Sequence, residues 1–293
     1  MSFENLTIGL IGAGNMARAL VRGLLKAGHP AGRLQVADPD PAQLEQVVAL
    51  HASVGIHGDN KDVAGVADVL VLAVKPQLMA DVARQIAAGP RRAGQLILSV
   101  AAGITLGSLR GWFGLDARLV RVMPNQPATI GAGISGLAAS FTLGEREREI
   151  AQYIASATGQ AVWLQDEALM DAVTAVSGSG PAYFYLLMEH MERAAVELGL
   201  SPELAAALTR ETALGAARVV IETKAEPARL RAAVTSPGGT TAAALRVFEA
   251  ANLDFIVRQA LTAARDRSAE LGRSPPGKKD HAERSRLHPA HPV

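Results

Sequence analysis

A glycine-rich segment at residues 9–17 constrains the fold of this chain more than any other feature. It directly follows the first apolar run and opens the first helical stretch, with Gly12, Gly14 and Ala17 at the small-residue positions of the pattern G-x-G-x-x-G/A. In such a loop the first glycine permits a tight turn, the second lets the backbone approach a pyrophosphate, and the helix N-terminus supplies unpaired N–H groups. The segment predicts a dinucleotide site, although a glycine-rich turn that binds no ligand would have the same sequence. The loop residues expected to contact the cofactor are Gly12, Ala13, Gly14, Asn15 and Met16.

The first half of the chain alternates short β-branched or apolar runs with helical stretches. This is the pattern of a parallel sheet wrapped by crossover helices. Several runs are apolar throughout, as expected for strands covered on both faces. The order predicts a Rossmann-like, doubly wound α/β domain over residues 1–164. The expected strands are 6–11, 34–37, 69–74, 96–100, 119–123 and 161–164, and the expected helices are 17–27, 41–50, 78–87 and 145–158.

From about residue 166 the β-branched runs stop, and the sequence up to residue 271 is rich in Ala, Leu, Glu and Arg. These are strong helix formers, so we expect an all-α C-terminal domain over residues 165–272. Breaks at Gly180-Pro181 and at Pro237-Gly238-Gly239 interrupt it. Residues 273–293 hold four prolines and little apolar surface, and we expect this tail to be disordered.

Composition excludes several kinds of function. The chain has no cysteine, which excludes disulfides, thiolate metal sites and a cysteine nucleophile, and its histidines are too scattered for a metal site. Residues 273–293 hold five of the 29 basic and two of the 28 acidic residues, so the rest of the chain carries a net charge of −2 and offers no basic surface for nucleic acid. No run approaches the roughly 20 apolar residues that span a bilayer, and the first residues lack a secretory n-region. We therefore expect a cytoplasmic protein that does not bind membranes.

Asp38 follows the second expected strand, where an acid usually accepts a hydrogen bond from the ribose 2′-OH of NAD and repels a 2′-phosphate. Taken alone, it favours NADH. It also precedes Pro39, in a segment rich in turn and helix-cap residues, and both interpretations stay open. Arg33 and Lys61 offer positive charge for a phosphate, but neither comes immediately after Asp38.

Two further strands end in residues suited to a ligand. Val74-Lys75-Pro76-Gln77 ends the third long strand at the carboxyl edge, where open α/β sheets bind ligands. Lys75 either contacts the cofactor or is a solvated strand-end charge. The next strand ends in Ser99-Val100-Ala101-Ala102-Gly103, whose small side chains would let a flat ring lie close to the backbone.

The segment 235–241 predicts an anion site in the helical half. Pro237-Gly238-Gly239 forms a turn, and Thr240-Thr241 begins a helix whose first N–H groups and hydroxyls would face a carboxylate. Plain N-capping by serine or threonine is the alternative.

Four motifs together resemble the pyrroline-5-carboxylate reductase family over about residues 8–271. They are Val74-Lys75-Pro76-Gln77, Met123-Pro124-Asn125, the segment 174–183 (TAVSGSGPAY) and the segment 235–241 (TSPGGTT). One departure is Gln126, where the family commonly has threonine. The tail after Gly272 has no counterpart in the family.

The resemblance implies a reductase that makes proline by adding hydride from NADPH, or from NADH as the alternative that Asp38 favours, to the C=N bond of 1-pyrroline-5-carboxylate. It implies that Thr174 is the hydrogen-bonding partner of the ring nitrogen. It also implies a homodimer built through C-terminal helices, with a decamer of five dimers as a larger assembly. The residues implied to contact the cofactor are Asn60, Val74, Lys75, Pro76 and Ala102, and those expected at the substrate carboxylate are Ser236, Gly239, Thr240 and Thr241.

Two other functions are weighed against this one. A 3-hydroxyacid dehydrogenase needs a general acid or base, usually His or Lys, yet residues 174–200 contain no lysine and only His190 as histidine. An imine can be protonated before hydride arrives, so a hydroxyl such as that of Thr174 would suffice, unless it only bonds the carbonyl four residues earlier. The second rival is a nucleotide-sensing module without turnover.

Overall fold

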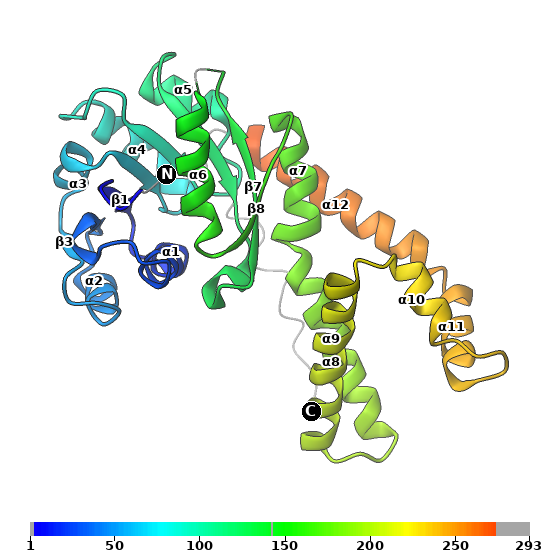
Figure 1. The fold of residues 1–293 in the computed structure, drawn as a ribbon. Helices are drawn as coiled ribbons and strands as arrows, with labels where there is room; N and C mark the ends of the chain where they lie inside the picture. The colour runs from blue at the N-terminus through cyan, green and yellow to red at the C-terminus, as the bar shows by residue number, and fades with distance from the viewer. Residues whose placement is uncertain (1–2, 142, 274–293) are drawn as a thin grey trace, which may run out of the picture. The chain divides into compact units, whose positions relative to one another are not determined.

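The computed structural model describes residues 3–141 and 143–273. These residues divide into two compact units, one holding the described residues up to 178 together with residues 265–273, and the other holding residues 179–264 (Figure 1). This division falls later in the chain than the change in composition near residue 164, because the segment after the last strand packs on the sheet and buries Met170 in its core. The predicted disordered tail, apart from Arg273, lies outside the described residues.

The first unit is built on an eight-stranded sheet with the order β3-β2-β1-β4-β5-β6-β7-β8. All neighbouring strands pair in parallel except β6 and β7, which are antiparallel. Because β1 lies between β2 and β4, the chain winds away from it in both directions, and its carboxyl end is the switch point at which such sheets bind ligands. The predicted doubly wound α/β fold is confirmed. The strands are β1 Ile8–Ile11, β2 Leu34–Ala37, β3 Gly55–His57, β4 Val69–Leu72, β5 Leu96–Ser99, β6 Arg118–Met123, β7 Gly133–Ala139 and β8 Gly159–Trp163.

Helices cover both faces of the sheet and create two hydrophobic cores. Helices α1, α2 and α6 bury apolar side chains against one face, and α3, α4 and α5 against the other. In β1, Ile8 and Leu10 belong to the first core and Ile11 to the second, which explains why this strand is apolar throughout. Each such buried side chain contributes about 1.5–3 kcal/mol through removal from water. The helices are α1 Asn15–Lys26, α2 Pro41–Val48, α3 Asn60–Val66, α4 Pro76–Ala87, α5 Leu106–Phe113 and α6 Glu145–Ser156.

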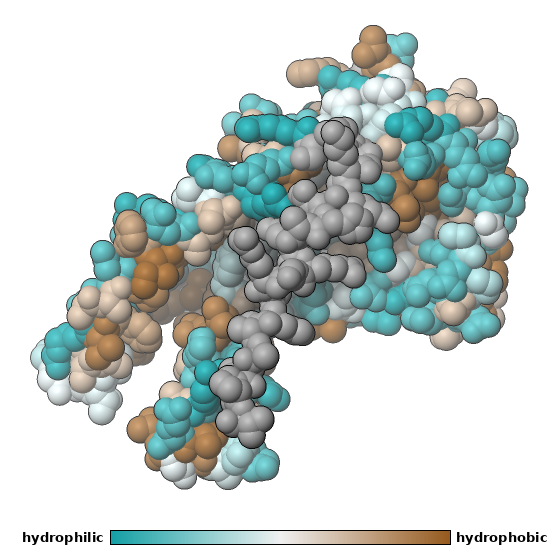
Figure 2. Space-filling model, turned by 180° about the vertical axis from the view of Figure 1, so that it is seen from behind, coloured by the Kyte–Doolittle hydropathy of each residue, from teal (hydrophilic) through white to brown (hydrophobic). Residues whose placement is uncertain are grey.

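The second unit consists of helices, and the all-α prediction for this part of the chain is confirmed. Its large apolar side chains are mostly exposed, including Phe184 and Ile221 at 65% and 73%, and apolar residues are visible on its surface in Figure 2. No described helix combines the length and the apolar composition that crossing a bilayer requires. The helices are α8 Gly180–Glu197, α9 Pro202–Thr223, α10 Pro227–Ala233, α11 Thr240–Ala250 and α12 Leu253–Arg273, the last of which returns to the first unit from Arg265 onward.

Short helical turns join the larger elements of the first unit. The segment after β8 contains three in succession, and the last of these is a π-helix. Segments of this type recur at functional sites because an extra residue widens the helix. The turns are η1 Ala31–Arg33, η2 Gln126–Ile130, η3 Glu167–Leu169, α7 Met170–Val173 and the π-helix η4 Thr174–Gly178.

His29 is a buried titratable group just after α1. It is 2% exposed, and its Nδ1 lies 3.2 Å from the hydroxyl oxygen of Tyr153 on α6. The Tyr153 ring also packs against Phe3, with ring centroids 5.3 Å apart. Burial lowers the pKa of His29 below its ordinary value of 6.5, because a charged imidazolium loses its hydration there.

We predict that acidification destabilises the protein partly through His29. The pKa is lowered only in the folded state, so as the pH falls the unfolded chain binds the proton first. The free energy of unfolding is therefore unaffected by His29 above about pH 6.5 and decreases as the pH falls below that value. Between about pH 7.5 and pH 5.5, the Tm of a His29→Phe variant should therefore fall less than that of the wild type, as followed by circular dichroism. The exposed His51→Phe is the control and should behave like the wild type. Equal losses of Tm in His29→Phe and wild type would contradict the prediction.

Candidate functional site

The glycine-rich loop connects β1 to α1 in a conformation that requires glycine at its first position. Gly12 has φ +96°, and a Cβ on it would lie 2.8 Å from the carbonyl oxygen of Ala73. Its N–H donates to the carbonyl of Ala37 at 2.7 Å. Gly12 thus lies between the ends of β2 and β4, where a side chain has no room.

Gly14 is glycine for a different reason. It is the N-cap of α1, has an ordinary extended conformation, and a Cβ on it would have no atom within 4 Å. No side chain caps the α1 N-terminus. The open space and the uncapped N–H groups together form a cradle that suits a phosphate group. A dinucleotide therefore fits the residues present.

Asp38 holds this loop in place. Its Oδ2 accepts a hydrogen bond from the Ala13 N–H at 2.8 Å, and its Oδ1 accepts one from the Asp40 N–H at 2.9 Å. Asp40 in turn caps α2 through the N–H of Ala42. The turn interpretation of Asp38 therefore applies, while a ribose contact remains a proposal because a carboxylate oxygen can accept a second hydrogen bond.

Arg18 was not singled out from the sequence, although it directly follows the fingerprint. Its guanidinium donates to the Ala13 carbonyl at 2.6 Å, to Gln43 Oε1 at 2.7 Å and to Asn15 Oδ1 at 2.6 Å. All three acceptors are neutral, and within the described residues no ion pair involves Arg18. A cation one position after the last small residue of the fingerprint is the signal that would have found it.

The other predicted cofactor residues lie after strands that end at the same edge of the sheet. Lys75 is the exposed N-cap of α4 and Pro76 its first residue, while Asn60 begins α3. Ala102 is exposed in the loop after β5. The N–H of Val100 still donates to the carbonyl of Leu72 at 3.1 Å, so neighbouring strands stay paired until these loops begin. The structure thereby brings the predicted cofactor residues to one edge of one unit.

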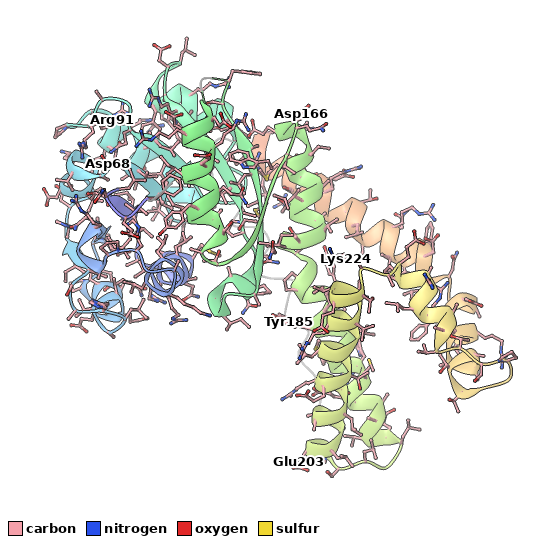
Figure 3. The ribbon with its side chains drawn as sticks, viewed as in Figure 1. Asp68, Arg91, Asp166, Tyr185, Glu203 and Lys224 are labelled. Atoms are coloured by element: carbon pink, nitrogen blue, oxygen red, sulfur yellow. The ribbon has the colours of Figure 1, made fainter. Side chains whose placement is uncertain are left out.

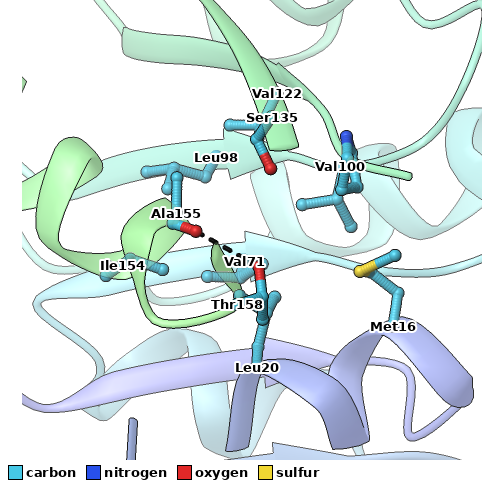
Figure 4. A pocket seen from close by; sticks show the side chains of 11 residues that line it. Met16, Leu20, Val71, Leu98, Val100, Val122, Ser135, Ile154, Ala155 and Thr158 are labelled. Atoms are coloured by element: carbon cyan, nitrogen blue, oxygen red, sulfur yellow. Dashed lines mark hydrogen bonds between the residues drawn. The ribbon is translucent and has the colours of Figure 1, made fainter. Parts of the chain in front are cut away.

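A small internal cavity lies between α1, the sheet and α6 (Figure 4). Its volume is about 10 Å³, and Met16, Leu20 and Ile154 contribute apolar walls. The Thr158 hydroxyl donates to the Ala155 carbonyl at 3.2 Å, and is satisfied there. A space of this size barely holds one water molecule, so it is a packing defect of the core and not a substrate site.

Thr174 is the first residue of the π-helix, and it is half-buried. Its hydroxyl donates to the carbonyl of Met170 at 2.9 Å, and Ser177 makes the same kind of bond to Val173. Bonding to the i−4 carbonyl therefore does occur here. The oxygen of Thr174 keeps lone pairs that can accept a hydrogen bond while its O–H donates to the Met170 carbonyl.

The predicted substrate turn belongs to the second unit. Gly238 has φ +72°, and the N–H of Gly239 donates to the carbonyl of Ser236 at 3.0 Å. Gly239 is the N-cap of α11, with no side-chain cap hydrogen bond. Plain N-capping by serine or threonine is therefore not what this turn does, and Thr240 and Thr241 are the first residues of the helix.

Comparison with known proteins settles the family. Residues 167–271 match the model for pyrroline-5-carboxylate reductase dimerisation, and residues 7–103 match that for NADP oxidoreductase, coenzyme F420-dependent. The pyrroline-5-carboxylate reductase of Pseudomonas aeruginosa is 48% identical over 264 residues, covering 90% of this chain and 96% of that protein. The chain belongs to the pyrroline-5-carboxylate reductase family.

Other pyrroline-5-carboxylate reductases agree in sequence and in structure. The enzyme of Haemophilus influenzae is 41% identical, covering 92% of this chain and 98% of that protein. The structure from Coxiella burnetii superimposes with a TM-score of 0.87 at 39% identity, covering 92% of this chain and 99% of that one. A Plasmodium falciparum pyrroline carboxylate reductase with NADP bound gives 0.82 at 29% identity, covering 92% and 100%. The family predicted from four short motifs is thus confirmed.

We predict that the two loop glycines fail in different ways when each is replaced by alanine. Gly12→Ala should lower the free energy of unfolding by about 2 kcal/mol or more, because it combines a positive φ with a clash at the Ala73 carbonyl. Gly14→Ala should keep the wild-type Tm and weaken NADPH binding by about tenfold or more, because its methyl group fills the cradle. Thermal unfolding and calorimetric titration of NADPH separate the two effects. Unchanged NADPH affinity in Gly14→Ala would mean that the pyrophosphate does not approach this residue.

Proposed function

We propose that this protein reduces 1-pyrroline-5-carboxylate to L-proline, the last step of proline biosynthesis, in the cytoplasm and with NADPH as its preferred cofactor. The observation that carries the proposal is the match over nine-tenths of the chain to curated pyrroline-5-carboxylate reductases. The uncapped glycine loops before α1 and α11 agree with it chemically, since one suits a pyrophosphate and the other a carboxylate.

NADPH, when bound, supplies the hydride that adds to C5 of the pyrroline ring. The backbone N–H groups around Gly14 would hold its pyrophosphate, and the loops at Asn60, Lys75 and Ala102 would surround the remainder. Arg18 supports NADPH over NADH, because neutral oxygens hold its guanidinium and leave its charge for a 2′-phosphate. Asp38 opposes this preference less than the sequence suggests, because both of its oxygens already accept backbone N–H groups.

The substrate would be held by its carboxylate and its ring nitrogen. The first N–H groups of α11 and the hydroxyls of Ser236, Thr240 and Thr241 would bind the carboxylate without a cationic side chain. Thr174 Oγ1 would accept the hydrogen bond of the protonated ring nitrogen, while its O–H still donates to the Met170 carbonyl. Such an arrangement positions an imine but offers no strong acid, which is sufficient when the nitrogen is already protonated.

The functional particle is proposed to be a homodimer, with a decamer of five dimers as its proposed larger assembly. The second unit exposes many large apolar side chains on α8, α9, α11 and α12, and exposed apolar surface of this kind commonly marks a protein–protein interface. The same residues fall within the matched dimerisation region. Burial between two copies would remove this surface from water.

We expect the purified protein to oxidise NADPH rapidly when 1-pyrroline-5-carboxylate is present, and NADH more slowly. The measurement is the loss of nicotinamide absorbance with each cofactor, on protein shown by sedimentation to be at least dimeric. An Arg18→Ala variant should bring the two rates closer, because it removes the charge that favours the 2′-phosphate. Absence of turnover with either cofactor would refute the proposed function and favour a nucleotide-sensing role.

Thr241→Ala should raise the KM for 1-pyrroline-5-carboxylate by about tenfold or more while lowering kcat far less, since a hydrogen bond to a carboxylate contributes about 1.5–3 kcal/mol and binds ground and transition states alike. Steady-state kinetics at saturating NADPH provide the measurement. Thr223→Ala is the matched control, because that hydroxyl at the end of α9 bonds only nearby backbone groups among those described, donating to the Val219 carbonyl and accepting from the Ala225 N–H. An unchanged KM in Thr241→Ala would remove Thr241 from the substrate site.

A further inference from the structure

The last turns of α12 return to the first unit and bury a serine there. Ser268 is 6% exposed, although the helix around it is mostly solvated. Its hydroxyl donates to Asp171 Oδ1 at 2.7 Å. Asp171 lies on α7, three residues before Thr174 and the π-helix that Thr174 begins.

The same end of α12 packs against the loop that follows β5. Gly103 has φ +74°, and a Cβ on it would lie 3.6 Å from Leu271. A Cβ on Gly272 would lie 3.7 Å from the Gly103 carbonyl oxygen. This loop contains Ala102, which is proposed to lie beside the nicotinamide ring.

A third contact holds the other end of the segment that leads into α7. Glu167, on η3 just after Asp166 (Figure 3), accepts hydrogen bonds at its Oε1 from the Leu106 N–H at 2.8 Å and from Arg121 Nη1 at 3.1 Å. The side chain of Arg121 is 5% exposed, so this ion pair is shielded from water on one side. The segment 167–171 is therefore held to the start of α5 and to β6 at one end, and to α12 at the other.

We propose that Asp171 and Ser268 are positioning residues for hydride transfer, which hold the Thr174 turn and the Ala102 loop in one fixed arrangement. The inference rests on the proposed function, because the roles of Thr174 and Ala102 belong to it. Helix α7 runs directly into the π-helix, so a contact made on α7 acts on the turn that carries Thr174. The hydrogen bond to Ser268 adds the link to α12 that buried Met170 and Glu167 do not provide, and its carboxylate acceptor makes it stronger than a bond between neutral groups.

The test compares kcat, KM and the isotope effect of variants at this hydrogen bond. Ser268→Ala and Asp171→Ala should each lower kcat by about tenfold, with both KM values within about twofold of the wild type, because misplacement slows the chemical step more than it weakens binding. The primary isotope effect with deuterated NADPH should rise in both, as hydride transfer becomes rate-limiting. Asp171→Asn keeps an acceptor oxygen and should retain most of the activity. Ser53→Ala, an exposed serine in the first unit, is the control for loss of a hydroxyl.

Two further variants keep the test decisive if an alanine variant folds poorly. Asp171→Glu keeps the charge but moves the oxygens by one methylene group, and should lower kcat about as much as Asp171→Ala. The double variant Ser268→Ala/Asp171→Ala should lose no more activity than either single variant, because one hydrogen bond is broken in all three.

Wild-type kcat in Ser268→Ala or Asp171→Glu would overturn the inference, and so would an Asp171→Asn variant as impaired as Asp171→Ala. Losses that appear only as a lower Tm, with kcat and isotope effect unchanged below the transition, would likewise assign the bond to stability alone. Failure of the proposed function is distinguishable, because it would show as absence of turnover in the wild type.

Discussion

The close approach of the Gly12 backbone to the carbonyl of Ala73 is the constraint on which the rest of the first unit depends. No side chain fits between them. Because Gly12 has none, the chain can leave β1, turn and enter α1 while β2 and β4 stay paired on either side of β1. The uncapped N-terminus of α1 follows this turn, and Asp38 fixes the next residue, Ala13, through its N–H. A backbone conformation available only to glycine thus precedes any chemistry of the loop.

The second unit depends on a different physical requirement. Its helices bury few of their own large side chains within one chain, and Ala205 and Thr209 are among the few buried residues of α9. Helices of this composition gain most of their stability from packing of apolar faces, so a second copy of the chain would complete what one copy leaves open. Folding and assembly of this unit would therefore be linked.

Much of the fold follows from the sequence because its signals are local. The run 6–11 and the fingerprint after it predicted both β1 and the start of α1. Strand β7 was missed because Gly133–Ala139 consists largely of small residues, which lack the β-branched or aromatic side chains that mark a strand. Strand β3 has only three residues, fewer than a periodic pattern needs.

Less of the candidate site than of the fold could be predicted from the sequence. Its motifs identified the family, but the role of Asp38 depends on an N–H 25 positions away in sequence, and that of Arg18 on Gln43. The division of the chain was hidden for the same reason, because composition does not reveal that residues 265–273 pack on the first unit. Contacts between residues so far apart produce no periodic pattern in the sequence.

The contact between Asp171 and Ser268 spans 97 positions, with the whole second unit in between. The ribosome synthesises the sheet and its cofactor loop long before the end of α12. For most of translation the nascent first unit therefore lacks residues 265–273, which pack on it in the folded protein. The contact between Asp171 and Ser268 can form only after residues 179–264 have been synthesised. The order of synthesis therefore makes Ser268 one of the last residues to become buried in a unit whose first strand begins at Ile8.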